Sequence, residues 1–249
     1  MNLLRLSLAL PLALAITACN DTAAEADADL SGEPVAAVPA PDGTTWTDTV
    51  QVTNADGYLL GNPDAPIKVV EYASLTCPAC AAFAEDGADQ LKEDYVATGR
   101  VSYELRNQIH GPHDLILAQL VRCGADETYH PLSDQVWKNL QSVLDPVFQQ
   151  QEAFGQALSG PENQRMVNAA EVAGFYDFFA QRGLSEDQAR TCLADFPAME
   201  QIAENSNTQS QELEVTGTPT FFINGRKIEL TNGPAWPQIE RRLQEAGAR

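Results

Sequence analysis

Basic side chains are scarce in this sequence of 249 residues, which holds 15 Lys and Arg against 35 Asp and Glu. The formal net charge of −20 disfavours nucleic acid as a partner, because a phosphate backbone is itself anionic. The sequence also lacks a Gly-rich phosphate loop, the nucleophile elbow of a Ser/His/Asp hydrolase, and an acidic cluster with calcium-loop spacing. Its apolar run at the N-terminus is too short to span a bilayer. What remains to carry chemistry is cysteine, of which there are five.

The first residues are typical of an export signal. Residues 1–18 hold one Arg5, no acid and a run rich in Leu and Ala, which predicts a signal peptide. The run ends Ile16-Thr17-Ala18-Cys19 and resembles the lipobox of bacterial lipoproteins, in which the cysteine is acylated and becomes the mature N-terminus. Cys19 is therefore our candidate lipidation site. An ordinary secretory signal that is cleaved nearby is the alternative.

Two cysteines stand where an apolar run ends and a helical pattern begins. Residues 67–73 form the run, and Cys77-Pro78-Ala79-Cys80 follows it closely. Apolar residues then recur at three- and four-residue steps from Cys80 to Tyr95, which predicts a helix. Because the fixed φ of Pro78 suits the first helical position, Cys77 falls at the N-cap. There the unpaired backbone N–H groups and the helix dipole favour a thiolate over a thiol.

This placement of the two cysteines predicts redox chemistry. A thiolate at Cys77 can attack a disulfide, and Cys80, one turn further, can resolve the mixed disulfide. A C-x-x-C pair that follows a strand and opens a helix is typical of such sites. A static structural disulfide and half of a zinc site are the alternatives. Zinc would need His110 and His113, whose distance from Cys80 does not fit a short zinc motif, so we expect no metal and no cofactor.

Export allows the other cysteines to be interpreted as a disulfide, because disulfides persist outside the cytoplasm. With Cys19 set aside as a lipid site, four cysteines remain. They pair naturally as Cys77 with Cys80 and Cys123 with Cys192, the second pair being structural. Two buried free thiols are the alternative for the second pair.

We expect one folded domain behind a linker. Residues 19–46 comprise the lipid site and a stretch rich in Ala, Pro and acids, without Lys or Arg, which predicts a disordered tether. A short helix that mediates oligomerisation is the alternative for this stretch. Residues 47–249 form the domain.

Strand patterns stand at both ends of the domain and helical patterns in its middle. The strands 67–73 and 101–109 flank a helix and are therefore expected to be parallel. The remaining predicted strands are 49–53, 58–60, 220–223 and 226–230, the last two joined by Asn224-Gly225 as a hairpin. Between about 112 and 214 we expect only helices, at 112–123, 131–143, 161–179, 185–194 and 197–213, and a closing helix near Pro237.

A second motif completes a resemblance to a known family. Gly217-Thr218-Pro219-Thr220-Phe221 places a proline before an apolar strand. Together with residues 67–80 it resembles the DsbA-like branch of the thioredoxin-fold oxidoreductases, bacterial extracytoplasmic proteins with a helical domain inserted in the fold. The resemblance covers the chain from about Leu60 onwards. It implies an α/β thioredoxin fold, a central mixed sheet flanked by helices, with an all-helical insert at about 112–214.

The resemblance also implies a role for each matching residue. Cys77 would be the nucleophile, Cys80 the resolving thiol, and Pro219 a cis-proline packed against their disulfide. Thr218 would offer its backbone to an extended substrate segment. Glu71 occupies the place of the family's buried acid and could relay the proton that Cys80 gains or loses. An exposed carboxylate at a sheet end is the alternative for Glu71.

The direction of electron flow is less well specified by the motifs. The dipeptide Pro78-Ala79 lacks the histidine of the family's strong oxidases, and Thr218 is more similar to the isomerase branch. We favour an oxidase that introduces disulfides into exported proteins and is recycled by a membrane redox partner, with an isomerase or a reductase as alternatives. A non-catalytic lipoprotein of the same fold is the alternative from another class. The expected location is the periplasm, with the protein anchored to a membrane through the Cys19 lipid.

Overall fold

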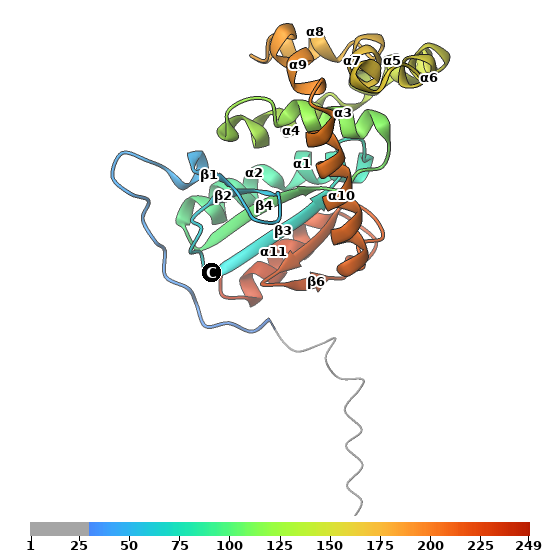
Figure 1. The fold of residues 1–249 in the computed structure, drawn as a ribbon. Coiled ribbons are helices and arrows are strands. Elements are labelled where there is room, and N and C mark those ends of the chain that lie inside the picture. Colours follow the sequence, from blue (N-terminus) through green and yellow to red (C-terminus); the bar gives the residue numbers. More distant parts are fainter. Residues whose placement is uncertain (1–29) are drawn as a thin grey trace, which may run out of the picture. The chain divides into compact units, whose positions relative to one another are not determined.

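A mixed β-sheet forms the centre of the computed structural model, which describes residues 30–249. The predicted signal peptide over 1–18 and the lipid site at Cys19 lie outside the described residues. The six strands follow the order β1-β2-β4-β3-β5-β6 (Figure 1). Their bounds are β1 (Val50–Val52), β2 (Tyr58–Gly61), β3 (Ile67–Ala73), β4 (Val101–Asn107), β5 (Thr220–Ile223) and β6 (Arg226–Ile228).

The pairing of the strands agrees with the sequence patterns. β3 and β4 run parallel, as expected for two strands joined through a helix, and every other pair is antiparallel. The β5–β6 hairpin turns at Asn224 and Gly225, whose φ angles are 51° and 78°. Two positive φ values in a two-residue turn are what Asn-Gly provides, so this predicted hairpin is confirmed.

Alternation along β3 decides which side chains face which helix. Glu71 lies opposite Phe221 in the register with β5, and Phe221 packs edge-on against Phe83 of α1 (Pro78–Asp86), with 4.7 Å between ring centroids. Tyr72 points to the opposite face of the sheet, where its hydroxyl donates to Gln209 of α10 (Phe196–Glu212). Glu71 is therefore buried on the face of the sheet that α1 covers.

The helix after β3 is shorter than its apolar pattern predicts. α1 ends at Asp86 and is followed by α2 (Ala88–Gln90), a π-turn η2 (Leu91–Tyr95) and a 3-10 turn η3 (Val96–Thr98). The break occurs at Gly87, where a Cβ atom would stand 2.5 Å from Cβ of Trp236 in α11 (Ala235–Glu245). Because Gly87 carries no side chain, α11 can pack closely there. Only a residue without a side chain fits at this break.

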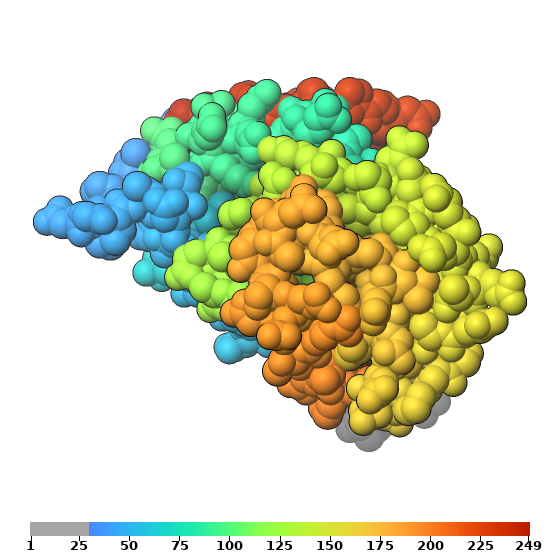
Figure 2. Space-filling view, turned by 90° about the horizontal axis from the view of Figure 1, so that it is seen from above, coloured from blue at the N-terminus to red at the C-terminus, as the bar shows by residue number. Residues whose placement is uncertain are grey.

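Between β4 and β5 the chain is helical, as the sequence predicts. Figure 1 shows α5 to α9 stacked beyond α3 and α4, away from the sheet, and Figure 2 looks onto these outer helices. Within residues 30–249 no helix is both long enough and apolar enough to cross a bilayer. The helices of the insert that precede α10 are α3 (Pro112–Val121), η4 (Asp126–Thr128), α4 (Tyr129–Lys138), α5 (Leu140–Gln149), α6 (Gln151–Leu158), α7 (Glu162–Val172), α8 (Phe175–Ala180) and α9 (Glu186–Leu193).

Three details of the insert differ from the sequence prediction. The helix predicted over 131–143 is two helices divided at Asn139, and the one predicted over 161–179 is divided at Gly174, whose φ is +70°. α6 was not predicted; it is short, and Phe154 is its only buried side chain. α9 begins with a capping box, in which the Ser185 hydroxyl accepts from the Gln188 backbone N–H.

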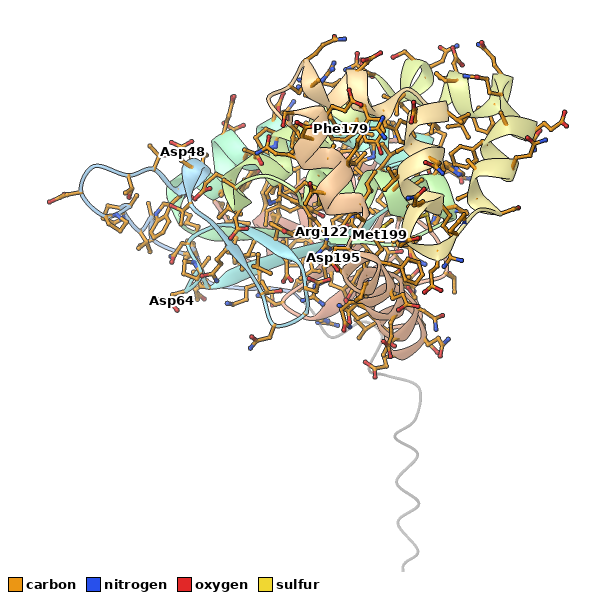
Figure 3. The ribbon with its side chains drawn as sticks, turned by 45° about the horizontal axis from the view of Figure 1, so that its top comes forward. Asp48, Asp64, Arg122, Phe179, Asp195 and Met199 are labelled. Atoms are coloured by element: carbon orange, nitrogen blue, oxygen red, sulfur yellow. A yellow bond between two sulfur atoms is a disulfide. The ribbon has the colours of Figure 1, made fainter. Side chains whose placement is uncertain are left out.

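Arg122, labelled in Figure 3, connects the turn between β1 and β2 to the insert. It follows α3, and its guanidinium donates to the Asp56 carboxylate at 2.9 Å and to the Asn107 side chain. The same group lies over the ring of Tyr58, which stacks on Tyr129 of α4. These contacts hold α3 and α4 against β2, which fixes the insert beside the sheet.

The prediction of a disordered tether over residues 19–46 is wrong for the part of it that the structure describes. Residues 31–46 lie along the domain and belong to the same compact unit. Backbone N–H groups of Gly32, Val35 and Val38 donate to carbonyl oxygens of the domain, and Trp46 is buried. Backbone hydrogen bonds, rather than buried side chains, hold most of this segment, and composition does not report such bonds. We call residues 31–46 the N-terminal strap.

Candidate active site

Cys77 occupies the N-cap of α1, with Pro78 at the first helical position. Its φ and ψ of −88° and 122° are extended, as an N-cap requires, and the helix runs on from Pro78. Its Sγ lies 3.3 Å from the carbonyl oxygen of Thr218, to which the protonated form of the thiol donates. Cys77 is half-buried, so its sulfur is accessible at the helix end.

The surroundings of Cys77 favour its thiolate. A hydrogen bond from the Cys80 thiol, one from the Thr218 side chain, and the backbone N–H groups of Cys80 and Ala79 together lower the pKa of Cys77 to about 5. Partial burial acts in the opposite direction but is the smaller effect. At neutral pH the reduced site therefore holds an ionised Cys77, which is the reactive form of a thiol.

Cys80 has the opposite character. It is fully buried one turn into α1. Burial raises its pKa well above the ordinary value, and the hydrogen bond to Cys77 and the nearby Glu71 carboxyl raise it further. One thiol of the pair is thus ionised and accessible while the other is protonated and buried, an asymmetry that suits attack by the first and resolution by the second.

The loop before β5 lies against Cys77. The Thr218–Pro219 peptide bond is cis, and the Thr220 hydroxyl donates to the Gly217 carbonyl, which holds the loop in place. Thr218 supplies the carbonyl that accepts from Cys77. Residues about 140 positions apart in the chain therefore meet at one sulfur atom, as the two sequence motifs suggested.

Glu71 is buried beneath this site, and none of the ion pairs among residues 30–249 includes it. Its Oε2 accepts from the Tyr103 hydroxyl at 2.5 Å, and its Oε1 has no hydrogen-bond partner among the described residues. Burial raises the pKa of Glu71 to about 8, although the Tyr103 hydrogen bond and Lys92 act to lower it. The carboxyl therefore holds its proton at neutral pH, and the exposed alternative for Glu71 does not apply, since the side chain is fully buried.

The ion pair between Lys92 and Asp134 is close enough to influence Glu71. Lys92 of η2 donates to the Asp134 carboxylate of α4 over 2.5 Å, and both act on the Glu71 pKa with opposite sign. These two residues, with His130 and Pro131, line a cavity of about 440 Å³. The pair joins η2 to α4 of the insert, next to the buried Glu71.

Asp114 is a site residue that the sequence did not indicate. This fully buried carboxylate in the first turn of α3 accepts from the Ser74 hydroxyl, the Leu75 N–H and the His110 N–H. It thereby fixes the loop that leads into Cys77. Asp114 is the third residue of the helix predicted over 112–123, a position where an acid often accepts from free backbone N–H groups. No local pattern in the sequence links it to Ser74.

His110 also reaches the site. Its Nε2 lies 3.4 Å from the Thr218 hydroxyl, which places an imidazole beside the loop that contacts Cys77. His113 lies elsewhere, with its ring 6.4 Å from those of Phe148 and Phe154. Among residues 30–249, no three His, Cys, Asp or Glu side chains are grouped so that they could hold a metal ion.

The other two cysteines are bonded to each other in the helical insert. Cys123, which follows α3, forms a disulfide with Cys192 of α9, with 6.0 Å between the Cα atoms. The Gln119 amide donates to the Cys192 carbonyl beside it. This pair joins two helices of the insert and takes no part in the arrangement around Cys77.

Comparisons with known proteins agree with this geometry. Residues 53–240 match the thioredoxin family. A putative protein-disulfide oxidoreductase of Rickettsia bellii (strain RML369-C) is 28% identical over 189 residues, which are 76% of this chain and 64% of that protein. The chain thus spans about 64% of the length of this curated relative.

Solved structures place the fold more closely. A protein-disulfide isomerase from Novosphingobium aromaticivorans is 30% identical, with a TM-score of 0.69 over 74% of this chain and 96% of its own. Wolbachia pipientis alpha-DsbA1 is 24% identical and shares the fold, with a TM-score of 0.61 over 82% of this chain and 96% of its own. The chain belongs to the thioredoxin family and has the DsbA-like form of the fold, in which helices are inserted into the α/β framework.

Proposed function

We propose that the protein is a thiol–disulfide oxidoreductase that exchanges disulfides with exported proteins through Cys77 and Cys80. The observation that carries this proposal is the meeting of an ionised, accessible Cys77 with a buried, protonated Cys80 and the Thr218–Pro219 loop. Each relative named above is called a disulfide oxidoreductase or isomerase or a DsbA protein, which supports the same activity.

In the oxidising direction the cycle begins with a disulfide between Cys77 and Cys80. A substrate thiolate attacks Sγ of Cys77, the bond to Cys80 breaks, and the Cys80 sulfur takes a proton. A second substrate thiolate then attacks the substrate sulfur of the mixed disulfide and displaces Cys77 as a thiolate. Two electrons pass from the substrate to the enzyme, and a membrane redox partner would accept them by a further exchange. The low pKa of Cys77 makes it a good leaving group in the second step.

Glu71 is the residue we propose to supply the proton for Cys80. With a pKa of about 8 it is protonated at neutral pH, and its unpartnered Oε1 is free to carry a proton within a buried site. The Glu71 charge raises the pKa of Cys80, which supports an interaction between the two groups. Glu71 would therefore donate as Cys80 leaves the disulfide and accept when the disulfide forms again.

Thr218 and Pro219 form the proposed substrate-binding edge. The Thr218 backbone lies at the sulfur of Cys77, so an extended segment that pairs with it would bring its own cysteine to that atom. Main-chain pairing requires no particular side chains, which agrees with an enzyme that acts on many proteins.

The stabilised thiolate favours an oxidase. Stabilising Cys77 as a thiolate stabilises the reduced protein and so raises the reduction potential of the pair. We expect a potential nearer to the about −120 mV of a strong oxidant than to the about −270 mV of thioredoxin, measured by equilibration with glutathione buffers. A potential near that of thioredoxin would contradict the oxidase assignment.

Isomerase is the second candidate, supported by Thr218 and by the name of the Novosphingobium protein. A scrambled, fully oxidised substrate separates the two activities, because only an isomerase restores its native pairing. The same substrate in reduced form tests the oxidase. In both assays the Cys77→Ser variant should be inactive, and retained activity in that variant would favour a non-catalytic role for the site.

We also propose export and lipid anchoring for this protein, on the sequence pattern of residues 1–19. Mass spectrometry of the mature N-terminus should find an acylated Cys19. An unmodified terminus beyond Cys19 would remove the anchor and leave a secreted or freely periplasmic enzyme.

A further inference from the structure

A histidine outside the two cysteine and proline motifs reaches the loop that contacts Cys77. His110 lies between β4 and α3, and its Nε2 is 3.4 Å from the hydroxyl oxygen of Thr218. The carbonyl oxygen of the same threonine lies 3.3 Å from Sγ of Cys77. The exchange steps at Cys77 and Cys80 leave this imidazole without a role.

We propose that His110 is a positioning residue for disulfide exchange, whose imidazole N–H donates to the Thr218 hydroxyl and so directs the hydrogen of that hydroxyl to the sulfur of Cys77. The proposal rests on the proposed function, since it adds a residue to the same site. The three side chains form a relay in which each donates to the next, and the relay ends at the atom that carries the negative charge.

The chemistry of a hydroxyl group fixes the direction of this relay. A hydroxyl has one hydrogen to donate, whereas its oxygen can also accept. The Thr218 side chain hydrogen-bonds to Cys77 and helps to lower the pKa of that thiol, and a thiolate can only accept, so the hydroxyl hydrogen is used at Cys77. Toward His110 the same oxygen can then only accept, which requires a hydrogen on Nε2.

The opposite direction is less favourable. If Thr218 donated to the imidazole, its hydrogen would point away from the sulfur, and the thiolate would lose that hydrogen bond. Hydrogen bonds to an ionised group are the stronger ones, so an ionised Cys77 favours the relay that ends on sulfur. Hydrogen bonds in a chain also polarise one another, which lets the imidazole act on a sulfur through the hydroxyl between them.

The backbone around His110 holds it at this place. The N–H of His110 donates to the buried Asp114 carboxylate at 2.9 Å. The backbone N–H groups of the two residues before it donate to the Ser206 hydroxyl of α10 and to the carbonyl of Ala73, the last residue of β3, each over 2.8 Å. Three consecutive residues are therefore anchored to three different elements, and only the side-chain torsions of His110 are left to adjust.

The size of the effect follows from the exposure of the contact. His110 is exposed and Thr218 is half-buried, so water competes for the imidazole hydrogen bond. Such a bond contributes at the lower end of the usual range, which corresponds to about threefold in an equilibrium constant. We therefore expect the relay to adjust the acidity of Cys77 rather than to create it, because most of the contacts that lower its pKa come from Cys80 and from backbone N–H groups.

The test measures the ionisation of Cys77 directly. Full-length reduced protein is titrated with acid while the ultraviolet absorbance of the thiolate is recorded, and the profile of Cys77→Ser is subtracted. His110→Ala should lower the acid dissociation constant of Cys77 about threefold. His110→Gln keeps a side-chain N–H and should remain close to wild type. His113→Ala is the matched control, since this histidine contacts Phe148 and Phe154 instead, and it should behave as wild type.

A double-mutant cycle tests the path through Thr218. Thr218→Val removes the hydroxyl but keeps the shape of the side chain. When His110→Ala is added to Thr218→Val it should have no further effect, because the relay is already interrupted. In equilibrium with glutathione, His110→Ala alone should shift the equilibrium constant about threefold toward the disulfide form, which lowers the reduction potential by about 14 mV.

The outcomes separate this proposal from the proposed function. An unchanged dissociation constant in His110→Ala, or an equal change in His113→Ala, would overturn the role of His110. An equal effect of His110→Ala with and without the Thr218 hydroxyl would overturn the relay, since the imidazole would then act on the sulfur by itself. The titration needs no exchange reaction, so a protein that shows the relay but never equilibrates with glutathione would overturn the proposed function alone.

Discussion

Cys77 and Cys80 are the same residue type in two environments, and the difference is set within one helical turn. Cys77 receives hydrogen bonds at the end of α1, while Cys80 is surrounded by protein. The first environment stabilises a negative charge and the second excludes it. The reactivity of the pair is therefore a property of position along the helix rather than of the cysteine side chain.

The lowered pKa of Cys77 makes the stability of the reduced protein depend on pH. Between about pH 5 and pH 9 the unfolded Cys77 holds a proton that the folded one has released, so stability rises with pH across this window. The stabilisation by the ionised Cys77 is therefore absent below about pH 5. We expect the difference in free energy of unfolding between the reduced wild type and Cys77→Ser, measured in urea, to grow from about pH 5 to about pH 9. A difference that is independent of pH would contradict the ionised Cys77.

Glu71 should produce a dependence of opposite sign. Its folded pKa of about 8 exceeds the ordinary 4.5, so within this window the folded protein holds a proton that the unfolded chain has lost. Its contribution therefore falls as pH rises from about 4.5 to about 8, by at most about 1.4 kcal/mol per pH unit. Glu71→Gln should remove this loss in urea unfolding of the oxidised protein, in which Cys77 does not titrate. Tyr103→Phe, which removes a hydrogen bond that stabilises the carboxylate, should deepen the loss. Identical pH profiles for wild type and Glu71→Gln would refute the raised pKa.

The sequence predicts site residues only where a local pattern marks them. Cys77, Cys80 and Thr218-Pro219 each stand in a short motif at the edge of an element, so their placement could be expected. Asp114 and His110 have no such mark, because their partners are Ser74 and Thr218, which come close only when the insert packs on the sheet. A contact between residues of two different elements leaves no periodic pattern in the sequence of either element.

At the scale of elements, the first turn of α3 acts as a clamp on the loop that carries Cys77. Asp114→Ala would remove the acceptor of three donors, two of them in buried hydrogen bonds, which should cost about 2–4 kcal/mol in urea unfolding. Asp114→Asn keeps one acceptor oxygen and should lose less. Asp187→Ala, which removes an exposed acid from the first turn of α9, is the matched control and should lose less than either. If Asp114→Ala behaved like this control, the clamp would be disproved.

The disulfide between Cys123 and Cys192 holds α3 and α9 together and closes a loop with a sequence separation of 69. Replacing both cysteines by alanine should lower the free energy of unfolding by up to about 4 kcal/mol, because the unfolded chain regains the freedom that the bond removed. The Cys77→Ser and Cys80→Ser double variant, which leaves this disulfide intact, should not show that loss. Two free thiols at these positions in the denatured, unreduced protein would show that the bond is absent.

Element boundaries could be predicted less well than element types, for a physical reason. The first helix ends before Gly87, where Trp236 packs too closely for a side chain, and a helix in the insert ends at Gly174, which has a left-handed conformation. At both positions the apolar periodicity of the sequence continues across the helix end, so the sequence does not mark it. The Asn224-Gly225 turn, by contrast, was predictable because its geometry depends on those two residues alone.

At the scale of the whole molecule, the same limit applies to the N-terminal strap. Its composition is that of a tether. The Val38 backbone nevertheless donates to the Thr98 carbonyl, at the end of the helical connection between β3 and β4, and accepts from the Trp46 indole N–H. Gly99 allows this approach, since its φ of +71° and the closeness of Val38 and Trp46 leave no place for a side chain. A segment can thus be ordered by a folded surface that its own sequence does not reveal.

The strap should consequently contribute to the stability of the domain. A chain that begins at residue 47 loses the buried Trp46 and the hydrogen bonds of Gly32, Val35 and Val38, and we expect it to be about 3 kcal/mol less stable than a chain that begins at residue 31. Trp46→Ala in the longer chain should account for most of the loss, because burial of the indole is the largest single contribution. Urea unfolding of the three proteins measures this. Equal midpoints for the two truncations would mean that residues 31–46 only cover the surface, and the domain would then begin where the sequence placed it.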